Sequence, residues 1–178
     1  DETDVKLTAT VLLLGEGKKI SLKGTADGVD EDGGTGYLVC TKKSDEREMS
    51  VDFSANGLEG DFDGFRIVGA RNLFGEKTDW DKRTARAALD DCTDPCSVVL
   101  QADGDSPFAC GYVALSVTFS SKGMAKIVGT MPDGTKVSIS SQLLVFEDRC
   151  VLPVVVPLYS GKKGGFGFSI TYPKGDGV

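Results

Sequence analysis

Residues 111–142 read GYVALSVTFSSKGMAKIVGTMPDGTKVSISSQ, and this stretch decides the fold class. Its first part alternates apolar residues with small or polar ones, which places the apolar set on one face of a β-strand: Val113, Leu115, Val117 and Phe119. Lys122-Gly123 and Pro132-Asp133-Gly134 follow as turn signals. The pattern predicts antiparallel strands at about 112–120, 124–130 and 135–146.

The same pattern extends in both directions along the chain. Downstream we expect strands at 150–159 and 166–172, with Pro153 and Pro157 favouring an edge or bulged position for the first of these. Upstream, alternating segments predict further strands at about 6–14, 18–23, 36–40, 49–53, 58–68 and 97–102. Turn signals at spacings near ten residues therefore predict an all-β, mainly antiparallel meander that forms a barrel or a sandwich.

One segment, at about 77–91, is expected to form a short α-helix. Thr78 is a suitable N-cap, and Asp79 and Asp81 fall in the first turn, where the helix dipole favours negative charge. The face formed by Trp80, Thr84, Ala87 and Ala88 would cover a sheet, with Trp80 as its anchor.

The length of 178 residues suits a single β-rich domain spanning 1–178. Within it, residues 51–58 (VDFSANGL) match residues 117–124 (VTFSSKGM). Two related meanders, at about 1–75 and 97–178 and joined by the helix, would explain the match by duplication. Convergent hairpin chemistry would explain it equally well.

Five cysteines are present, at positions 40, 92, 96, 110 and 150. An oxidising compartment would allow two bridges and one free thiol. Cys92 and Cys96 are four positions apart around Pro95, and a local disulfide between them is the pairing that we predict. For Cys40, Cys110 and Cys150, burial as small apolar side chains is an equal alternative.

Two acidic loops raise the question of calcium. Glu59, Asp61 and Asp63 occupy alternate positions before Gly64, as in a calcium loop, but Ala70 stands where such a loop needs its bidentate glutamate. Residues 27–32 form the second acidic cluster. A solvated turn is the preferred interpretation of both, and we predict no metal site.

Composition excludes several classes of function. The chain has no histidine, which removes Ser-His and Cys-His nucleophiles. The net charge of −7 argues against nucleic-acid binding, and the most apolar stretch, 151–159, is too short to span a membrane. Carboxylates are numerous, but no pair is marked out for hydrolysis. The expectation is a protein that is not an enzyme, with no catalytic residue and no cofactor, and no ligand-binding residue is identified.

Residues 111–142 also resemble a β-rich module that recurs in large bacterial surface and secreted proteins, mainly through Gly129-Thr-Met-Pro-Asp-Gly-Thr135. The resemblance implies a location outside the cell and a non-enzymatic structural or adhesive role. The partners would be neighbouring modules of the same or another surface protein, with glycans as further candidates. A carbohydrate- or small-ligand-binding domain is the alternative, which an exposed Trp80 beside a tyrosine would favour.

Overall fold

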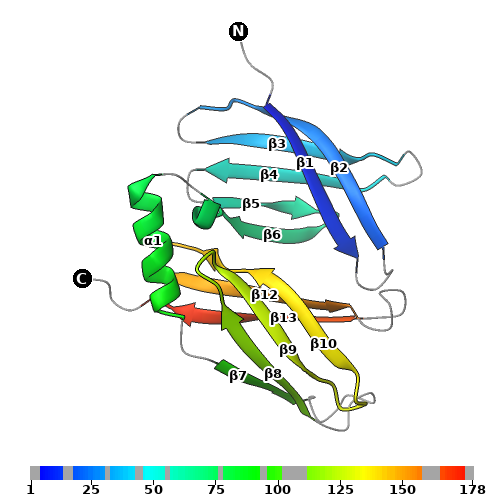
Figure 1. Ribbon diagram of the computed structural model, residues 1–178. Helices are drawn as coiled ribbons and strands as arrows, with labels where there is room; N and C mark the ends of the chain where they lie inside the picture. Colours follow the sequence, from blue (N-terminus) through cyan, green and yellow to red (C-terminus); the bar gives the residue numbers. More distant parts are fainter. Residues whose placement is uncertain are drawn as a thin grey trace. The chain divides into compact units, whose positions relative to one another are not determined.

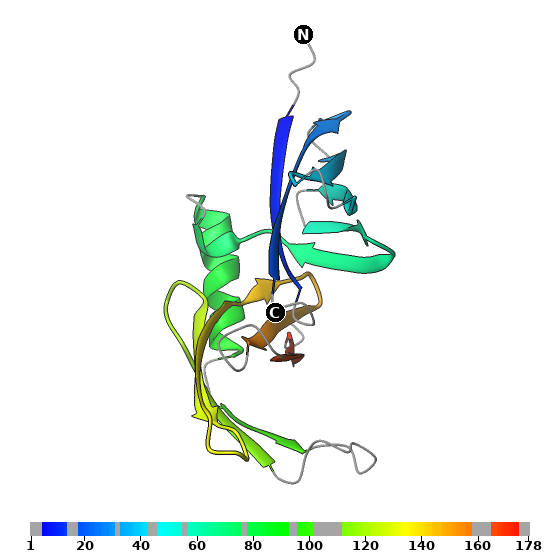
Figure 2. The ribbon, with the colours of Figure 1, turned by 90° about the vertical axis from the view of Figure 1, so that its right-hand side faces the viewer.

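The computed structural model describes residues 5–13, 18–30, 33–42, 46–54, 57–75, 78–92, 96–101, 112–157 and 165–174. The fold is all-β and mostly antiparallel, with three sheets, one of them curled into a half-barrel, and one short α-helix (Figure 1 and Figure 2). The predicted fold class is therefore confirmed. By its internal contacts the chain divides into two compact units, which are described separately.

Unit 1 comprises residues 1–71 and 157–166. Its sheet holds six strands in chain order: β1 (Val5–Leu13), β2 (Lys18–Asp27), β3 (Gly33–Cys40), β4 (Glu48–Ser54), β5 (Gly57–Phe62) and β6 (Phe65–Ala70). Each strand pairs antiparallel with the next, so this sheet is a simple meander.

One boundary in unit 1 differs from the sequence prediction. A single strand was expected over 58–68, but the chain turns at Asp63-Gly64, and Phe62 pairs with Phe65. Asp63 and Gly64 both have positive φ, at 53° and 82°. Two consecutive residues of this kind form the tight hairpin turn for which Asp-Gly is a favoured pair, and this turn separates β5 from β6.

The core of unit 1 lies on one face of this sheet. Strand β2 alternates, so that its polar residues Lys19, Ser21 and Lys23 point outward. The buried cluster contains Ile20, Leu22, Leu38, Met49, Val51 and Phe62. Partly buried side chains from β1 and β6, including Leu7 and Ile67, pack against it. All six strands therefore contribute to one apolar cluster.

Unit 2 comprises residues 72–156 and 167–178. Its larger sheet has the order β10-β9-β8-β7, with antiparallel pairing throughout. The strands are β7 (Cys96–Gln101), β8 (Tyr112–Phe119), β9 (Met124–Thr130) and β10 (Lys136–Gln142). Val113, Leu115 and Val117 are buried on one face, as their alternation predicts, and Phe119 is half-buried.

A second sheet begins where a single strand was expected over 135–146. The strand breaks at Leu143, which is 1 % exposed and donates its N–H to the carbonyl of Gly123. Beyond the break lies the three-stranded sheet β11-β12-β13, made of β11 (Leu144–Val145), β12 (Arg149–Pro157) and β13 (Gly165–Pro173). The division between the units falls inside β12 and β13, near their ends.

Strand β12 is the middle strand of its sheet and not the expected edge strand, and it accommodates Pro153 on one side because β11 is short. β11 pairs only with Cys150 and Val151, so Pro153 lies beyond the end of that pairing and costs no hydrogen bond there. Alternate side chains of β12 are almost completely buried: Cys150, Leu152, Val154 and Val156.

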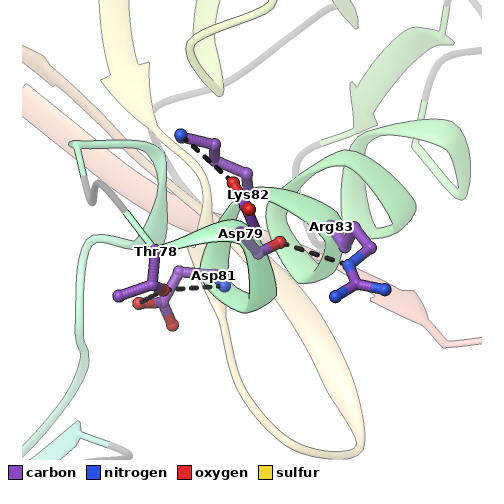
Figure 3. Close-up of polar contacts among 5 residues, drawn as sticks. All are labelled: Thr78, Asp79, Asp81, Lys82 and Arg83. Atoms are coloured by element: carbon purple, nitrogen blue, oxygen red, sulfur yellow. Dashed lines mark hydrogen bonds and ion pairs between the residues drawn. The ribbon is translucent and has the colours of Figure 1, made fainter.

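The helix α1 (Asp79–Asp90) belongs to unit 2 and begins as predicted. The Thr78 hydroxyl accepts a hydrogen bond from the Asp81 N–H at 3.1 Å and donates one to the Asp81 carboxylate at 2.5 Å (Figure 3). This reciprocal pair satisfies a backbone donor that the first helical turn leaves open.

The buried face of α1 is not the one expected from the sequence. Asp81, Ala85, Ala88 and Leu89 are buried, whereas Trp80 is 73 % exposed. The prediction that Trp80 anchors the helix is therefore wrong. The buried stripe follows the spacing i, i+4, i+7 and i+8, displaced by one position from the predicted face. Within the described residues, no helix is both long enough and apolar enough to cross a membrane.

Candidate functional site beside helix α1

A hollow of about 530 Å³ lies beside α1 in unit 2. Its walls come from three elements: α1, the short 3₁₀ helix η1 (Leu73–Gly75) and the end of β8 with the turn that follows it. The lining residues are Leu73, Phe74, Lys82, Ala85, Arg86, Leu89, Asp90, Phe119, Ser120 and Ser121. The hollow therefore combines an apolar wall with a charged rim, the composition of many small-molecule sites.

The apolar wall is held in place by the β8–β9 turn. Gly123 in this turn has a φ of 67°, and a Cβ at this position would lie only 2.3 Å from the Phe74 ring. The Gln142 side-chain amide donates to the Gly123 carbonyl at 3.0 Å, and the Leu143 N–H donates to the same oxygen at 2.9 Å. The turn is thus fixed from β10 while Phe74 packs against it.

A second aromatic contact supports Phe119. Its ring meets that of Tyr172 in β13 edge to face, with centroids 6.0 Å apart and planes at 74°. This arrangement is one of the favoured geometries of aromatic pairs. Phe74 and Phe119 therefore approach the hollow from different elements, each supported by a neighbour on its other side.

The charged rim comes from one helix face. Lys82, Arg86 and Asp90 are spaced four apart on α1, which places them along one side of the helix. The Lys82 ammonium lies 3.5 Å from the Asp79 carboxylate, and both side chains are largely exposed (Figure 3). Among the described residues, Arg86 has no ion-pair partner. The rim therefore carries one more positive than negative charge.

The sequence did not identify this hollow. The sequence marked out neither Lys82 nor Arg86, and it placed Phe119 on the apolar face of its strand. The only available signal was the i, i+4 spacing of the two cations.

A ligand-binding domain was expected to show an exposed Trp80 beside a tyrosine. Trp80 is exposed, which meets the first half of this criterion. Among the tyrosines, Tyr37 lies in unit 1, and a hydrogen bond with the Glu48 carboxylate raises its pKa.

The acidic residues that suggested calcium have protein partners. The Glu59 carboxylate lies 3.1 Å from Arg66, and that of Asp63 lies 3.5 Å from Arg47. Asp61 accepts the Gly64 N–H at 2.8 Å, as a turn residue does. Within the part of the chain that the structure describes, no cluster of three or more acidic or cysteine side chains could hold a metal ion.

Two cysteines of unit 2 meet in its interior. Cys92 follows α1 and is 2 % exposed, and Cys150 in β12 is 0 % exposed. Burial raises the pKa of Cys92 to about 12, and each thiol also acts on the pKa of the other, so the two thiols are neighbours. Burial also raises the pKa of Cys150, although the nearby Lys174 ammonium opposes the shift. The side chain of Cys96 and all of Cys110 lie outside the described residues, so the predicted Cys92–Cys96 disulfide stays a prediction.

Chemically, the hollow can bind an amphipathic molecule, with an anionic group at Arg86 and an apolar part against Phe74 and Phe119. Comparison with known proteins adds no further constraint. No family model, no curated protein and no solved structure matches this chain.

Proposed function

We propose that the chain is a non-enzymatic structural or adhesive β-module of a cell-surface protein that acts by binding neighbouring modules or glycans. The observation that carries this proposal is the exposure of large aromatic side chains on a β-rich scaffold. Trp80 is 73 % exposed in unit 2, and Phe65 is 71 % exposed in unit 1. Exposed aromatic residues are the side chains that most often dominate binding at protein interfaces, and they also stack on sugar rings.

Retention of coated beads tests the adhesive role. Beads that carry the purified chain are passed over surfaces bearing a glycan panel, extracellular matrix proteins or the same chain. We expect retention on at least one surface and a loss of about fivefold or more in Trp80→Ala. Val99→Ala is the matched control, because Val99 is also exposed, at 62 %, but is not aromatic. Equal retention of both variants would contradict a role for Trp80.

Surface location is tested independently of binding. Antibodies against the chain should label intact cells of the source organism, and protease added outside the cell should remove the signal. Labelling that requires cell lysis would overturn the proposed location while leaving the bead result standing.

A small-ligand-binding domain is the second candidate, and the hollow beside α1 is the observation that favours it. Its two cations and two phenylalanines suit an amphipathic anion better than a neutral sugar. The Arg86 guanidinium would pair with the anionic group, and the Phe74 and Phe119 rings would contact the apolar part.

The fluorescent anion 8-anilinonaphthalene-1-sulfonate serves as the probe for this second candidate. We expect Arg86→Gln to weaken its binding about fivefold, the typical size of a partly exposed ion pair. Arg83→Gln is the matched control, because the Arg83 side chain donates to the Asp79 carbonyl and does not line the hollow. Equal affinity of the two variants would rule out the hollow as the binding site of the anion.

A further inference from the structure

We propose that Cys92 and Cys150 form a disulfide bond that joins the end of helix α1 to strand β12. The two residues lie 58 positions apart in the sequence, and both belong to unit 2. Both side chains are buried, at 2 % and 0 % exposure, and the two thiols are near enough for each to act on the pKa of the other. In the structure both are free thiols, so the proposal concerns what these side chains become on oxidation.

The backbone on each side of this thiol pair is fixed. The Asp91 N–H bonds to the carbonyl of Ala87, and the Cys92 N–H bonds to that of Leu89 at 2.9 Å, so Cys92 continues the last helical turn. Cys150 lies opposite Val145 in the β11–β12 ladder. Two neighbouring thiols on ordered backbone can form a disulfide where rotation of their side chains brings the sulfur atoms together.

Helix α1 buries few apolar side chains, and most of them are small. Its buried apolar residues are two alanines and one leucine, Ala85, Ala88 and Leu89, while its large aromatic residue, Trp80, faces solvent. A helix of 12 residues is only marginally stable by itself and depends on tertiary packing. A covalent bond at its C-terminal end would compensate for this small buried surface.

The oxidation of the two thiols needs an electron acceptor. In the experiment oxidised glutathione, itself a disulfide, is that acceptor. One cysteine loses its proton and attacks glutathione disulfide, which releases one glutathione thiolate and leaves a mixed disulfide. The second cysteine then displaces the other glutathione. Overall, two protein thiols and one glutathione disulfide give one protein disulfide and two glutathione thiols. Because both thiols are buried, we expect the reaction to proceed during folding rather than in the folded chain.

Peptide mapping identifies the partner of Cys92. The whole chain is unfolded, refolded with oxidised and reduced glutathione, and alkylated. Trypsin and an endoproteinase that cleaves before aspartate then place Cys92 in the tripeptide 91–93, Cys96 in 94–102 and Cys150 in 150–162. We expect the linked pair 91–93 with 150–162. A link between 91–93 and 94–102 would establish Cys92–Cys96 instead and overturn the proposal, as would an alkylated Cys92.

Thermal unfolding gives a second readout that needs no variant. A bond closing a loop of this length should raise the Tm of the chain by about 10 °C, an increase that a reductant abolishes. The double variant Cys92→Ala/Cys150→Ala should lack the reductant-sensitive shift, and Cys40→Ala, a half-buried cysteine of unit 1, should retain it. A reductant-sensitive shift that survives in the double variant would assign the bond to other cysteines. These outcomes do not depend on where the protein is located, because the experiment supplies the oxidant.

Discussion

At the scale of single residues, Gly123 is required both by its backbone conformation and by the side chain that packs against it. A side chain there would have to adopt a φ of 67° and would place its Cβ 2.3 Å from the Phe74 ring. Gly134, in the β9–β10 turn of the same unit, also has positive φ, at 83°, but nothing lies within 4 Å of its Cβ position. Substituting each of the two glycines therefore separates the cost of backbone strain from the cost of a steric clash.

We expect Gly134→Ala to lower the free energy of unfolding by about 1 kcal/mol, the backbone cost alone. Gly123→Ala should cost about 2–4 kcal/mol, because displacement of Phe74 adds to that backbone cost. Urea unfolding of both variants measures the difference. Similar losses in the two variants would show that Phe74 moves aside freely and that the wall of the hollow is not fixed.

In the reduced protein, the thiols of Cys92 and Cys150 make the free energy of unfolding depend on pH. An unfolded cysteine ionises near pH 9.0, whereas burial raises the pKa of Cys92 to about 12 in the folded chain. Between these values the folded state retains a proton that the unfolded state has lost. Stability from the neutral thiol is therefore complete below pH 9 and falls as pH rises, by at most about 1.4 kcal/mol per pH unit.

Urea unfolding at pH 8, 9 and 10 with a phosphine reductant measures this slope. Because lysines and tyrosines also titrate in this range, the reference is the double variant Cys92→Ala/Cys150→Ala. The reduced wild-type chain should lose stability faster than this variant as the pH rises. Parallel curves would show that the thiols are not buried as described.

At the scale of elements, the N-terminus of α1 depends on a single hydroxyl. Thr78→Ala removes both hydrogen bonds with Asp81, leaving a helical N–H and a buried carboxylate without this partner. We expect a loss of about 1–2 kcal/mol in the free energy of unfolding. Thr84→Ala is the matched control, because the Thr84 hydroxyl donates only to the Trp80 carbonyl inside the helix and alanine favours helix. A loss as large as that of Thr78→Ala would argue against the cap.

Helices and strands were predictable from the sequence where neighbouring residues along the chain determine them. The strands expected at about 112–120, 124–130 and 166–172, the helix and its cap follow from alternation and from Thr78-x-x-Asp81, and the structure confirms them. The helix face was not predictable, because alanines at 85, 87 and 88 carry little hydrophobic signal. The break at Leu143 was not predictable either, because it depends on a hydrogen bond to Gly123, a distant residue.

The matched strings 51–58 and 117–124 illustrate the same limit. Both contribute to two strands that pair antiparallel, yet Val51 pairs with Gly60 whereas Val117 pairs with Ile127. The second pairing is one residue longer, so Gly57 lies in a strand while Gly123 occupies a turn with positive φ. The shared residues therefore specified an antiparallel pair of strands but not the register of its pairing. For the same reason the hollow escaped prediction, because it depends on how Phe74 meets that turn.

At the scale of the whole molecule, the expectation of a single domain over 1–178 can be tested by its cooperativity. Strands β12 and β13 each carry residues of both units, since residues 157–166 belong to unit 1 and the strands' other residues to unit 2. Unfolding of unit 1 would therefore release the ends of two strands whose remaining parts belong to unit 2. We expect the units to unfold together.

Leu22→Ala tests this coupling from inside unit 1. Leu22 is completely buried in the cluster of the six-stranded sheet, so its truncation should cost about 2–5 kcal/mol. Hydrogen exchange followed by mass spectrometry should then show faster global exchange in β8 and β9 as well as in β2 and β3, and Leu152→Ala should give the same pattern from unit 2. If protection were lost only in the substituted unit, and unfolding showed two transitions, the units would be two independently folding domains. The residues of β12 and β13 that belong to both units would then not couple the stability of one unit to that of the other.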